Sequence, residues 1–284
     1  MITVLEAIRL STDYLDKKGV ESSRTNAEIL LAEILKCKRL ELYLSFDKPL
    51  AVTELNLYRE FIRKRGLRVP LQYIIGNVDF YGINLIVNEH VLIPRPETEL
   101  LIEKIITDVK SLDQLKILDI GTGSGNISIA LSHHIKNCEV TGIDISEKAL
   151  QIAKANAEKN PSHNKIDFRL FDILNDELNE LGLFDIIVSN PPYVSVSDYQ
   201  SLEPELKNNE PKESLTDNSD GLSFYRHIIS ISRNILKKGG KLYFEIGKDQ
   251  SSHVKEFMLA GKFRSVSIIK DYAGIDRIIC GEME

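Results

Sequence analysis

The apolar residues of this chain recur at helical spacing up to about residue 70 and at mixed helix and strand spacing beyond it. The first region predicts three helices, whose apolar faces carry in turn Val4, Leu5, Ile8, Thr12 and Leu15; Ile29, Leu30, Ile34 and Leu35; and Leu55, Tyr58, Phe61 and Ile62. Gly19 and Gly66 end the first and third helices, and Thr25 with Glu28 has the spacing of a capping box that opens the second. Residues 1–69 are therefore expected to form a small helical bundle.

Beyond the bundle the pattern changes twice. Residues 80–87 read as a β-hairpin that turns at Gly82 or Asn84, so residues 70–96 are expected to be a hairpin connector. From Glu97 onward, helical segments alternate with short apolar strands, as in a parallel, doubly wound sheet. The last two predicted strands, 266–269 and 277–280, lie close enough in sequence to finish the sheet as an antiparallel edge hairpin. The fold class is thus α/β, with residues 97–284 forming the sheet domain.

A glycine-rich turn follows the first predicted strand of this sheet, residues 116–120. Its residues are Gly121, Thr122, Gly123, Ser124 and Gly125, and a helical pattern begins at Asn126. Strand, glycine turn and helix open a nucleotide-binding βαβ unit, because glycines let the backbone approach a ligand and the helix N-terminus offers unpaired N–H groups. Asn126 stands where a dinucleotide fingerprint has its third glycine, which favours an adenosine ligand without a pyrophosphate over NAD.

Acidic residues follow the next two predicted strands. Asp144 ends the strand at 139–143 and lies 23 residues after Gly121, a spacing at which a carboxylate accepts both ribose hydroxyls of an adenosine. Asp172 follows the strand predicted at 166–171. It either accepts a hydrogen bond from the adenine amino group, with Ile173 against the ring, or caps the next helix.

The tetrapeptide Asn190, Pro191, Pro192 and Tyr193 closes another apolar strand, residues 184–189. Two prolines stop a strand and form a stiff corner at its carboxyl end, where doubly wound sheets place their ligands. The Asn190 side-chain oxygen and the Pro191 carbonyl suit the two hydrogens of a flat NH2 group, and the Tyr193 ring suits its plane. We therefore expect Asn190, Pro191 and Tyr193 to be catalytic, with Pro192 as a further substrate contact and Asn190 also touching the cofactor.

In this order, the glycine turn, the acid and the corner resemble class I S-adenosylmethionine-dependent methyltransferases that act on planar amino nitrogens. Further segments resemble, more narrowly, the HemK/PrmC family of protein-glutamine N5-methyltransferases, which modify class I peptide-chain release factors. Those segments are residues 70–76, residues 91–99 (Val-Leu-Ile-Pro-Arg-Pro-Glu-Thr-Glu), Glu210-Pro211, Asp220-Gly221-Leu222, Tyr225-Arg226, Phe244-Glu245-Ile246-Gly247 and residues 271–277. The chain has Ile275 where the family usually has a basic residue, which affects a local contact near the C-terminus and not the chemistry.

The resemblance implies a Rossmann-like methyltransferase domain at 97–284, a connector at 70–96 and a helical domain at 1–69 that recognises the release factor. It implies S-adenosylmethionine as the cofactor, held by residues 121–125, Asp144, Asp172 and Ile173, and no metal. The block around Arg95 and Glu97 either caps a helix that starts at Pro96 or closes over the cofactor.

Two other functions stay open on the sequence: a DNA adenine-N6 methyltransferase that flips its base into the same corner, and a non-catalytic binding module. The net charge of −6 and the absence of Trp count against the first, and the intact turn, Asp144 and corner count against the second. The one dense basic run, residues 63–68, is either a solvated helix end or a contact for an acidic or RNA-bearing partner.

The remaining composition is that of an ordinary globular protein, with 43% hydrophobic and 27% charged residues over 284 positions. Its three cysteines are isolated in the sequence, which argues against a disulfide framework or a zinc site. Glu6 and Arg9 interrupt the first apolar stretch, so no signal peptide is expected, and no apolar run approaches the roughly 20 residues of a membrane span. We expect a cytoplasmic monomer.

Overall fold

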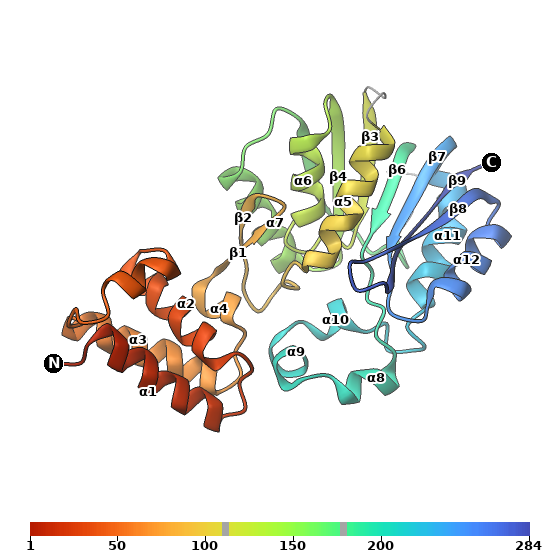
Figure 1. Ribbon diagram of the computed structural model, residues 1–284. Coiled ribbons are helices and arrows are strands. Elements are labelled where there is room, and N and C mark those ends of the chain that lie inside the picture. The colour runs from red at the N-terminus through yellow and green to blue at the C-terminus, as the bar shows by residue number, and fades with distance from the viewer. Residues whose placement is uncertain (110–113, 177–180) are drawn as a thin grey trace. The chain divides into compact units, whose positions relative to one another are not determined.

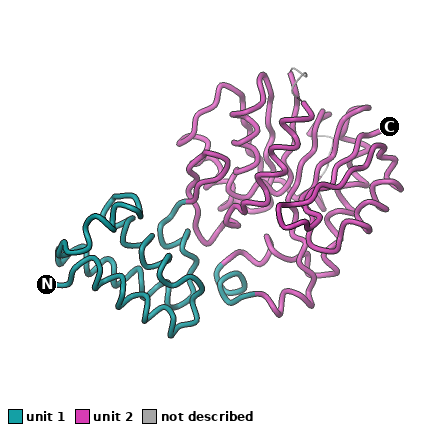
Figure 2. The backbone as a smooth tube through the Cα atoms, in the orientation of Figure 1, with its two compact units in different colours: residues 1–77, 203–209 teal, residues 78–202, 210–284 magenta. Residues whose placement is uncertain are grey.

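The computed structural model describes residues 1–109, 114–176 and 181–284. The chain divides into two compact units, which Figure 2 shows in different colours. Unit 1 contains residues 1–77 together with residues 203–209, and unit 2 contains residues 78–202 and 210–284. A short segment from the second half of the chain therefore packs with the N-terminal helices.

Unit 1 is helical, as predicted. Its elements are α1 (Val4–Lys17), α2 (Ser23–Leu35), η1 (Arg39–Leu44), α3 (Val52–Gly66), α4 (Leu71–Ile75) and, from the second half of the chain, α9 (Pro204–Asn209). A reciprocal capping box opens α1: the Thr3 hydroxyl accepts from the Glu6 backbone N–H at 3.3 Å, and the Glu6 carboxylate accepts from the Thr3 N–H at 3.0 Å. The helices enclose a core that contains Leu15, Leu30 and Tyr58, all buried.

Two details of the predicted bundle are wrong. The helix α2 begins at Ser23, so Thr25 lies inside it and does not cap it. Glu28 is buried and accepts instead from Arg24 Nε at 2.9 Å and from the Tyr43 hydroxyl at 2.8 Å, because a capping-box spacing also occurs inside helices whose Glu has other partners. Leu5 is 43% exposed, since consecutive helical positions lie about 100° apart and the core takes Val4 instead.

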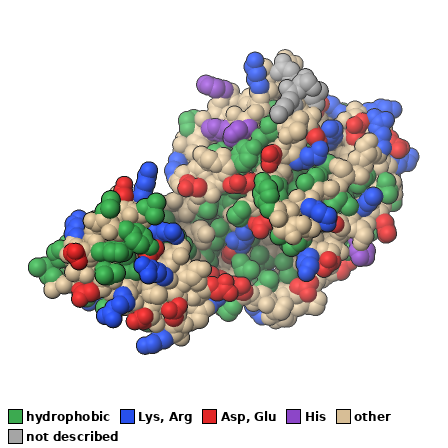
Figure 3. Space-filling model, viewed as in Figure 1, with side chains coloured by type: hydrophobic (Ala, Val, Ile, Leu, Met, Phe, Trp, Pro, Cys, Tyr) green, Lys and Arg blue, Asp and Glu red, His purple; other side chains and the backbone are tan. Residues whose placement is uncertain are grey.

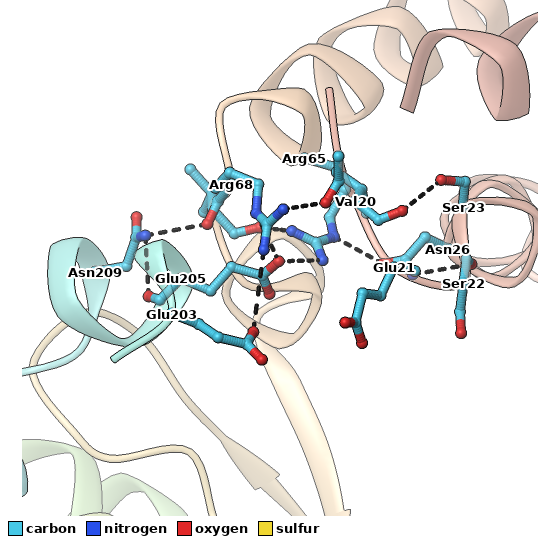
Figure 4. Close-up of polar contacts among 12 residues, drawn as sticks. Val20, Glu21, Ser22, Ser23, Asn26, Arg65, Arg68, Glu203, Glu205 and Asn209 are labelled. Atoms are coloured by element: carbon cyan, nitrogen blue, oxygen red, sulfur yellow. Dashed lines mark hydrogen bonds and ion pairs between the residues drawn. The ribbon is translucent and has the colours of Figure 1, made fainter. Parts of the chain in front are cut away.

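A cluster of ion pairs holds residues 203–209 within unit 1 (Figure 4). Arg65 is 5% exposed and donates from Nη2 to Glu205 Oε1 at 2.8 Å, from Nε to Asn26 Oδ1 at 2.7 Å and from Nη1 to the Val69 carbonyl at 3.2 Å. Arg68 Nε lies 3.0 Å from the same Glu205 oxygen. Two arginines of the basic run are thus engaged inside unit 1, so the prediction of a simple solvated helix end is wrong at these positions.

Replacing Arg65 by alanine is expected to destabilise unit 1 by about 2–3 kcal/mol, because Glu205 and Asn26 lose a buried charged partner while Arg68 retains part of the pairing. Hydrogen exchange should show the first loss of protection at 203–209. The matched control is Arg63→Ala, which removes an exposed arginine of the same helix and should change stability by less than about 0.5 kcal/mol. Equal effects of the two variants would contradict this assignment.

A hairpin formed by β1 (Asn77–Phe80) and β2 (Ile83–Ile86) begins unit 2, with only its first residue, Asn77, assigned to unit 1. The turn lies at Tyr81 and Gly82, whose φ angles of 48° and 76° are those of a two-residue hairpin turn, so Gly82 and not Asn84 marks the reversal. Phe80, Ile83 and Leu85 are buried in the core of unit 2. By packing, the hairpin therefore belongs to unit 2, and its role as a connector stays a prediction.

A seven-stranded sheet forms the centre of unit 2, in the order β5-β4-β3-β6-β7-β9-β8. The strands are β3 (Leu115–Ile120), β4 (Cys138–Asp144), β5 (Lys165–Leu170), β6 (Phe184–Ser189), β7 (Leu236–Glu245), β8 (Phe263–Lys270) and β9 (Asp276–Met283). Strands β3 to β7 pair in parallel, and β9 is antiparallel to both β7 and β8. The predicted doubly wound sheet and its edge hairpin are confirmed. The strand order reverses between β3 and β6, which is where such sheets bind ligands.

Helices cover both faces of the sheet (Figure 1). One face packs against α5 (Pro96–Val109), α6 (Asn126–His134) and α7 (Glu147–Lys159), and the other against α11 (Ser223–Ile235) and α12 (Ser251–Ala260). Successive strand residues point to opposite faces of the sheet. Ile117 packs in the core beside α5, α6 and α7, and Leu118 packs in the core beside α11 and α12. The segment between β6 and α11 carries the short helices α8 (Val196–Ser201), α9 and α10 (Lys212–Leu215). In the part of the chain that the structure describes, we find no helix of the length and apolarity that crossing a membrane requires.

Candidate active site

A cavity of about 370 Å³ opens at the carboxyl ends of β3, β4, β5 and β6 in unit 2. The predicted site residues that line it are Gly121, Gly123, Asp144, Asp172, Ile173, Asn190, Pro191 and Pro192. They come from four successive strand ends separated by up to about 70 positions in the sequence, by subtraction of the residue numbers. The fold thus brings the glycine turn, both acids and the proline corner to one space. Thr122, Ser124, Gly125 and Tyr193 are not among its lining residues.

The glycine turn is left-handed at each glycine, with φ of 74° at Gly121, 55° at Gly123 and 80° at Gly125. A Cβ at Gly121 would meet nothing within 4 Å, so this residue is required for its backbone angle and for the open space beside it. At Gly125 a Cβ would approach Ala153, Ile129 and Phe168 at 3.2 Å, so the last glycine serves packing between α6 and its neighbours.

Asp119 lies beneath the glycine turn, does not line the cavity and was not among the predicted site residues. It precedes the turn on β3, is fully buried, and accepts at Oδ2 from the hydroxyls of Thr122 and Ser128, both at 2.7 Å. Burial raises its pKa to about 6. Within the described residues its Oδ1 is buried and has no hydrogen-bond partner. The sequence signal for this buried acid is its position two residues before Gly121.

The backbone holds the Asp144 carboxylate in place at the end of β4. Its Oδ2 accepts from the Gly123 N–H at 2.9 Å and its Oδ1 from the Ser146 N–H at 2.9 Å. Burial raises the pKa of this group, and the backbone hydrogen bonds partly offset the rise. Each carboxylate oxygen keeps a lone pair for a further donor, so Asp144 is suited to accept from a pair of hydroxyls in the cavity.

Asp172 holds a local turn and also lines the cavity. The strand β5 ends at Leu170, so Asp172 lies beyond it in the connection. Its carboxylate accepts from the Leu174 N–H at 2.9 Å and from Asn175 Nδ2 at 2.7 Å. Residues 173–175 form a turn, so in the described part of this connection Asp172 holds a turn and does not cap a helix. Ile173, 8% exposed, and the 63% exposed Ile145 add apolar surface to the same part of the wall.

A chain of buried polar groups supports the proline corner. Asn190 Nδ2 donates to Thr98 Oγ1 at 3.3 Å, and the Thr98 hydroxyl donates to Glu245 Oε2 at 2.5 Å. The Tyr193 hydroxyl lies 3.4 Å from Glu245 Oε1. Thr98 and Glu245 are each 1% exposed. Thr98, in the first turn of α5, was not among the predicted site residues.

The backbone at Tyr193 is held tightly as well. Its carbonyl accepts from Gln250 Nε2 at 2.9 Å. A Cβ at Gly221 would lie 2.4 Å from this carbonyl, so no residue with a side chain fits there without moving the corner. Gly221 also has a φ of 79°, which glycine adopts readily.

Arg95 precedes α5 and pairs with Glu210. Its Nη2 lies 2.6 and 2.7 Å from the two carboxylate oxygens of Glu210, a residue that is 5% exposed. The Thr98 N–H donates to the Arg95 carbonyl at 3.1 Å, so the block does form the first turn of a helix that starts at Pro96. Glu97 lines a separate cavity of about 340 Å³ and not the one described above.

Surface charge and candidate metal ligands bear on the alternative functions. On the face seen in Figure 3, Lys and Arg side chains are interspersed with Asp and Glu and form no continuous basic surface among the residues drawn in colour. Over the residues placed in the structure, no group of three or more His, Cys, Asp or Glu side chains is arranged to hold a metal ion.

Both parts of the chain match known protein families. Residues 6–76 match the family model described as the PrmC N-terminal domain, and residues 111–265 match one described as a methyltransferase domain. A release factor glutamine methyltransferase of Fusobacterium nucleatum is 41% identical over 97% of this chain and 77% of its own length. The protein of the same name from Geobacter sulfurreducens is 36% identical over 99% and 97%. The crystal structure of a methyltransferase from Pyrococcus furiosus, 21% identical, has a TM-score of 0.51 over 72% of this chain and 90% of that one, and shows the shared fold.

Proposed function

Because this chain belongs to the release factor glutamine methyltransferase family, we propose that it methylates the side-chain amide nitrogen, N5, of the glutamine in the Gly-Gly-Gln motif of class I peptide-chain release factors. S-adenosylmethionine is the methyl donor. The observation that carries the proposal is one cavity in which the Asn190 and Pro191 corner faces the glycine turn and Asp144.

The lining residues fit such a cofactor. Gly121 and Gly123 leave room for the methionine and ribose portion, Asp144 offers a carboxylate to the ribose hydroxyls, and Ile173 offers an apolar wall to the adenine. Asp172 is proposed to accept a hydrogen bond from the adenine amino group through a lone pair that the hydrogen bonds to Leu174 and Asn175 do not use. When bound, the cofactor supplies a methyl group activated by its sulfonium, so the protein's task is orientation.

The corner supplies that orientation. An amide nitrogen is a poor nucleophile because its lone pair is delocalised into the carbonyl. Asn190 Oδ1 and the Pro191 carbonyl are proposed to accept the two hydrogens of the substrate NH2, which raises the electron density on nitrogen and aims it in line with the methyl group. The nitrogen then gives up one of these protons to water after the transfer, so no general base is needed before it. Tyr193, next to Pro192 in the chain, is proposed to cover the amide plane.

The helices of residues 1–69 are proposed to recognise the release factor, since the candidate catalytic groups all lie in unit 2. Activity on a release factor also implies work in the cytoplasm, and we propose a monomer because one chain carries all the groups named here. The relatives' names and the interspersed surface charges favour this reading over a DNA methyltransferase.

Methyl transfer from labelled S-adenosylmethionine tests the proposal. A release factor, its Gln→Ala variant in the Gly-Gly-Gln motif, and duplex DNA are offered side by side. We expect label on the native release factor and on neither of the others. Label on DNA, or equal label on the Gln→Ala variant, would overturn the proposed substrate.

A further inference from the structure

We propose that Thr98 and Glu245 are positioning residues that fix the Asn190 side chain with its oxygen, and not its NH2, toward the substrate amide. This inference rests on the proposed function in so far as the substrate is an NH2 group. The proposed function does not explain why Asn190 presents its oxygen, and not its NH2, to the substrate. The amide oxygen and nitrogen have nearly the same shape, so packing alone cannot distinguish them.

The number of hydrogens available at Thr98 determines the orientation of the Asn190 amide. A threonine hydroxyl has one hydrogen. Above the pKa of Glu245 the carboxylate is ionised and can only accept, so Thr98 directs this hydrogen to Glu245 Oε2 at 2.5 Å. Toward Asn190, Thr98 Oγ1 is then left as an acceptor, and the group it meets at 3.3 Å must be the Asn190 NH2. The Asn190 oxygen is thereby turned to the other side, where Asn190 lines the cavity.

The same carboxylate also reaches the second side chain of the corner. The Tyr193 hydroxyl lies 3.4 Å from Glu245 Oε1, and the Tyr225 hydroxyl donates to the Glu245 main-chain carbonyl at 3.0 Å. One residue at the end of β7 thus organises Asn190 through Thr98 and Tyr193 directly. Removing it would loosen both parts of the corner.

The position of Glu245 is unfavourable for a charge. It is 1% exposed, and burial raises its pKa to about 7 from an ordinary 4.5. Thr98 and the Arg277 cation oppose the rise, whereas the Glu97 carboxylate adds to it. Since the folded pKa lies above the ordinary value, Glu245 makes the protein less stable as pH rises from about 4.5 to about 7, and the loss is constant above that. The ionised form of Glu245 thus costs folding stability, so its burial is better explained by the orientation it imposes on Asn190.

Protonation of Glu245 should undo the orientation. A neutral carboxyl can donate its proton to Thr98 Oγ1, and the Thr98 hydroxyl is then free to donate to the Asn190 oxygen. The amide would turn and present its NH2 to the NH2 of the substrate, where neither group can accept. We therefore expect kcat to fall as pH decreases through about 7.

Two substitutions at Thr98 separate the hydroxyl from packing. Thr98→Val keeps the shape and removes the hydroxyl, and should lower kcat at pH 8 by about 30-fold while KM and cofactor affinity stay within about threefold. Thr98→Ser keeps the hydroxyl and should stay within about threefold of the wild type in kcat. A Thr98→Val enzyme with kcat within twofold of wild type, or equal losses in both variants, would overturn the proposal.

Glu245→Gln tests the charge. The acidic limb of the kcat profile near pH 7 should disappear, because glutamine does not titrate, whereas persistence of the limb would show that another group causes it. The ¹⁵N–¹H resonances of the Asn190 side chain give a readout without turnover, since the hydrogen bond to Thr98 should be present in wild type and Thr98→Ser and absent in Thr98→Val. If the wild type methylated DNA and not a release factor, the proposed function would fail, and the same variants measured on DNA would still decide the positioning.

Discussion

Replacing Asn190 by alanine should lower kcat about a thousand-fold, because the substrate nitrogen loses a preorganised acceptor. The Pro191 carbonyl, a backbone group, remains. Cofactor affinity should stay within about threefold, since Gly121, Gly123 and Asp144 hold the cofactor independently. Single-turnover methyl transfer together with calorimetric binding of S-adenosylhomocysteine measures both quantities.

The matched control for this variant is Asn56→Ala, which removes an exposed asparagine from α3 in unit 1. It should leave kcat unchanged. An Asn190→Ala enzyme that keeps more than a tenth of wild-type turnover would show that Asn190 does not act on the substrate nitrogen. A parallel loss of cofactor binding would instead assign it to the cofactor site.

Asp144→Asn is expected to weaken cofactor affinity about a hundred-fold, because hydrogen bonds to a charged acceptor contribute about 1.5–3 kcal/mol each. The new NH2 would also face a donor, either the Gly123 or the Ser146 N–H, each of which lies 2.9 Å from a carboxylate oxygen in the wild type. Calorimetric titration at pH 8 provides the Kd.

The pH dependence offers a second check on Asp144. Its pKa is raised, and the carboxylate is the form that accepts from the ribose, so wild-type affinity should fall as pH drops through that pKa while the Asp144→Asn variant stays flat. The control is Asp16→Asn on the exposed side of α1. Unchanged affinity in Asp144→Asn would remove Asp144 from the cofactor site.

Much of the site could be predicted because its parts are local in sequence. A glycine turn between a strand and a helix, an acid at the next strand end and two prolines after a third each require a few consecutive residues. Parallel strands then bring their carboxyl ends to one edge, and the cavity collects Gly121, Asp144 and Asn190 for that reason.

The contacts that the sequence did not reveal join residues that are far apart in the chain. Thr98 meets Asn190 across 92 positions and Glu245 across 147, and nothing in a short window signals either contact. The false capping box at Thr25 shows the opposite failure, in which a local pattern is present but tertiary partners take its Glu28. Short sequence patterns therefore predict the residues that contact a ligand better than they predict the residues that orient those contacts.

The placement of residues 203–209 in unit 1 affects how this protein can be divided or recombined. The chain passes between the units at three points, after residues 77, 202 and 209, so the boundary is not a single linker. A fragment that ends at residue 77 would lack Glu205, the partner of Arg65, and one that starts at residue 78 would carry α9 without its packing surface. A chimaera that exchanges unit 1 between relatives should therefore transplant 203–209 together with 1–77, and a single cut near residue 77 should leave the two pieces associated.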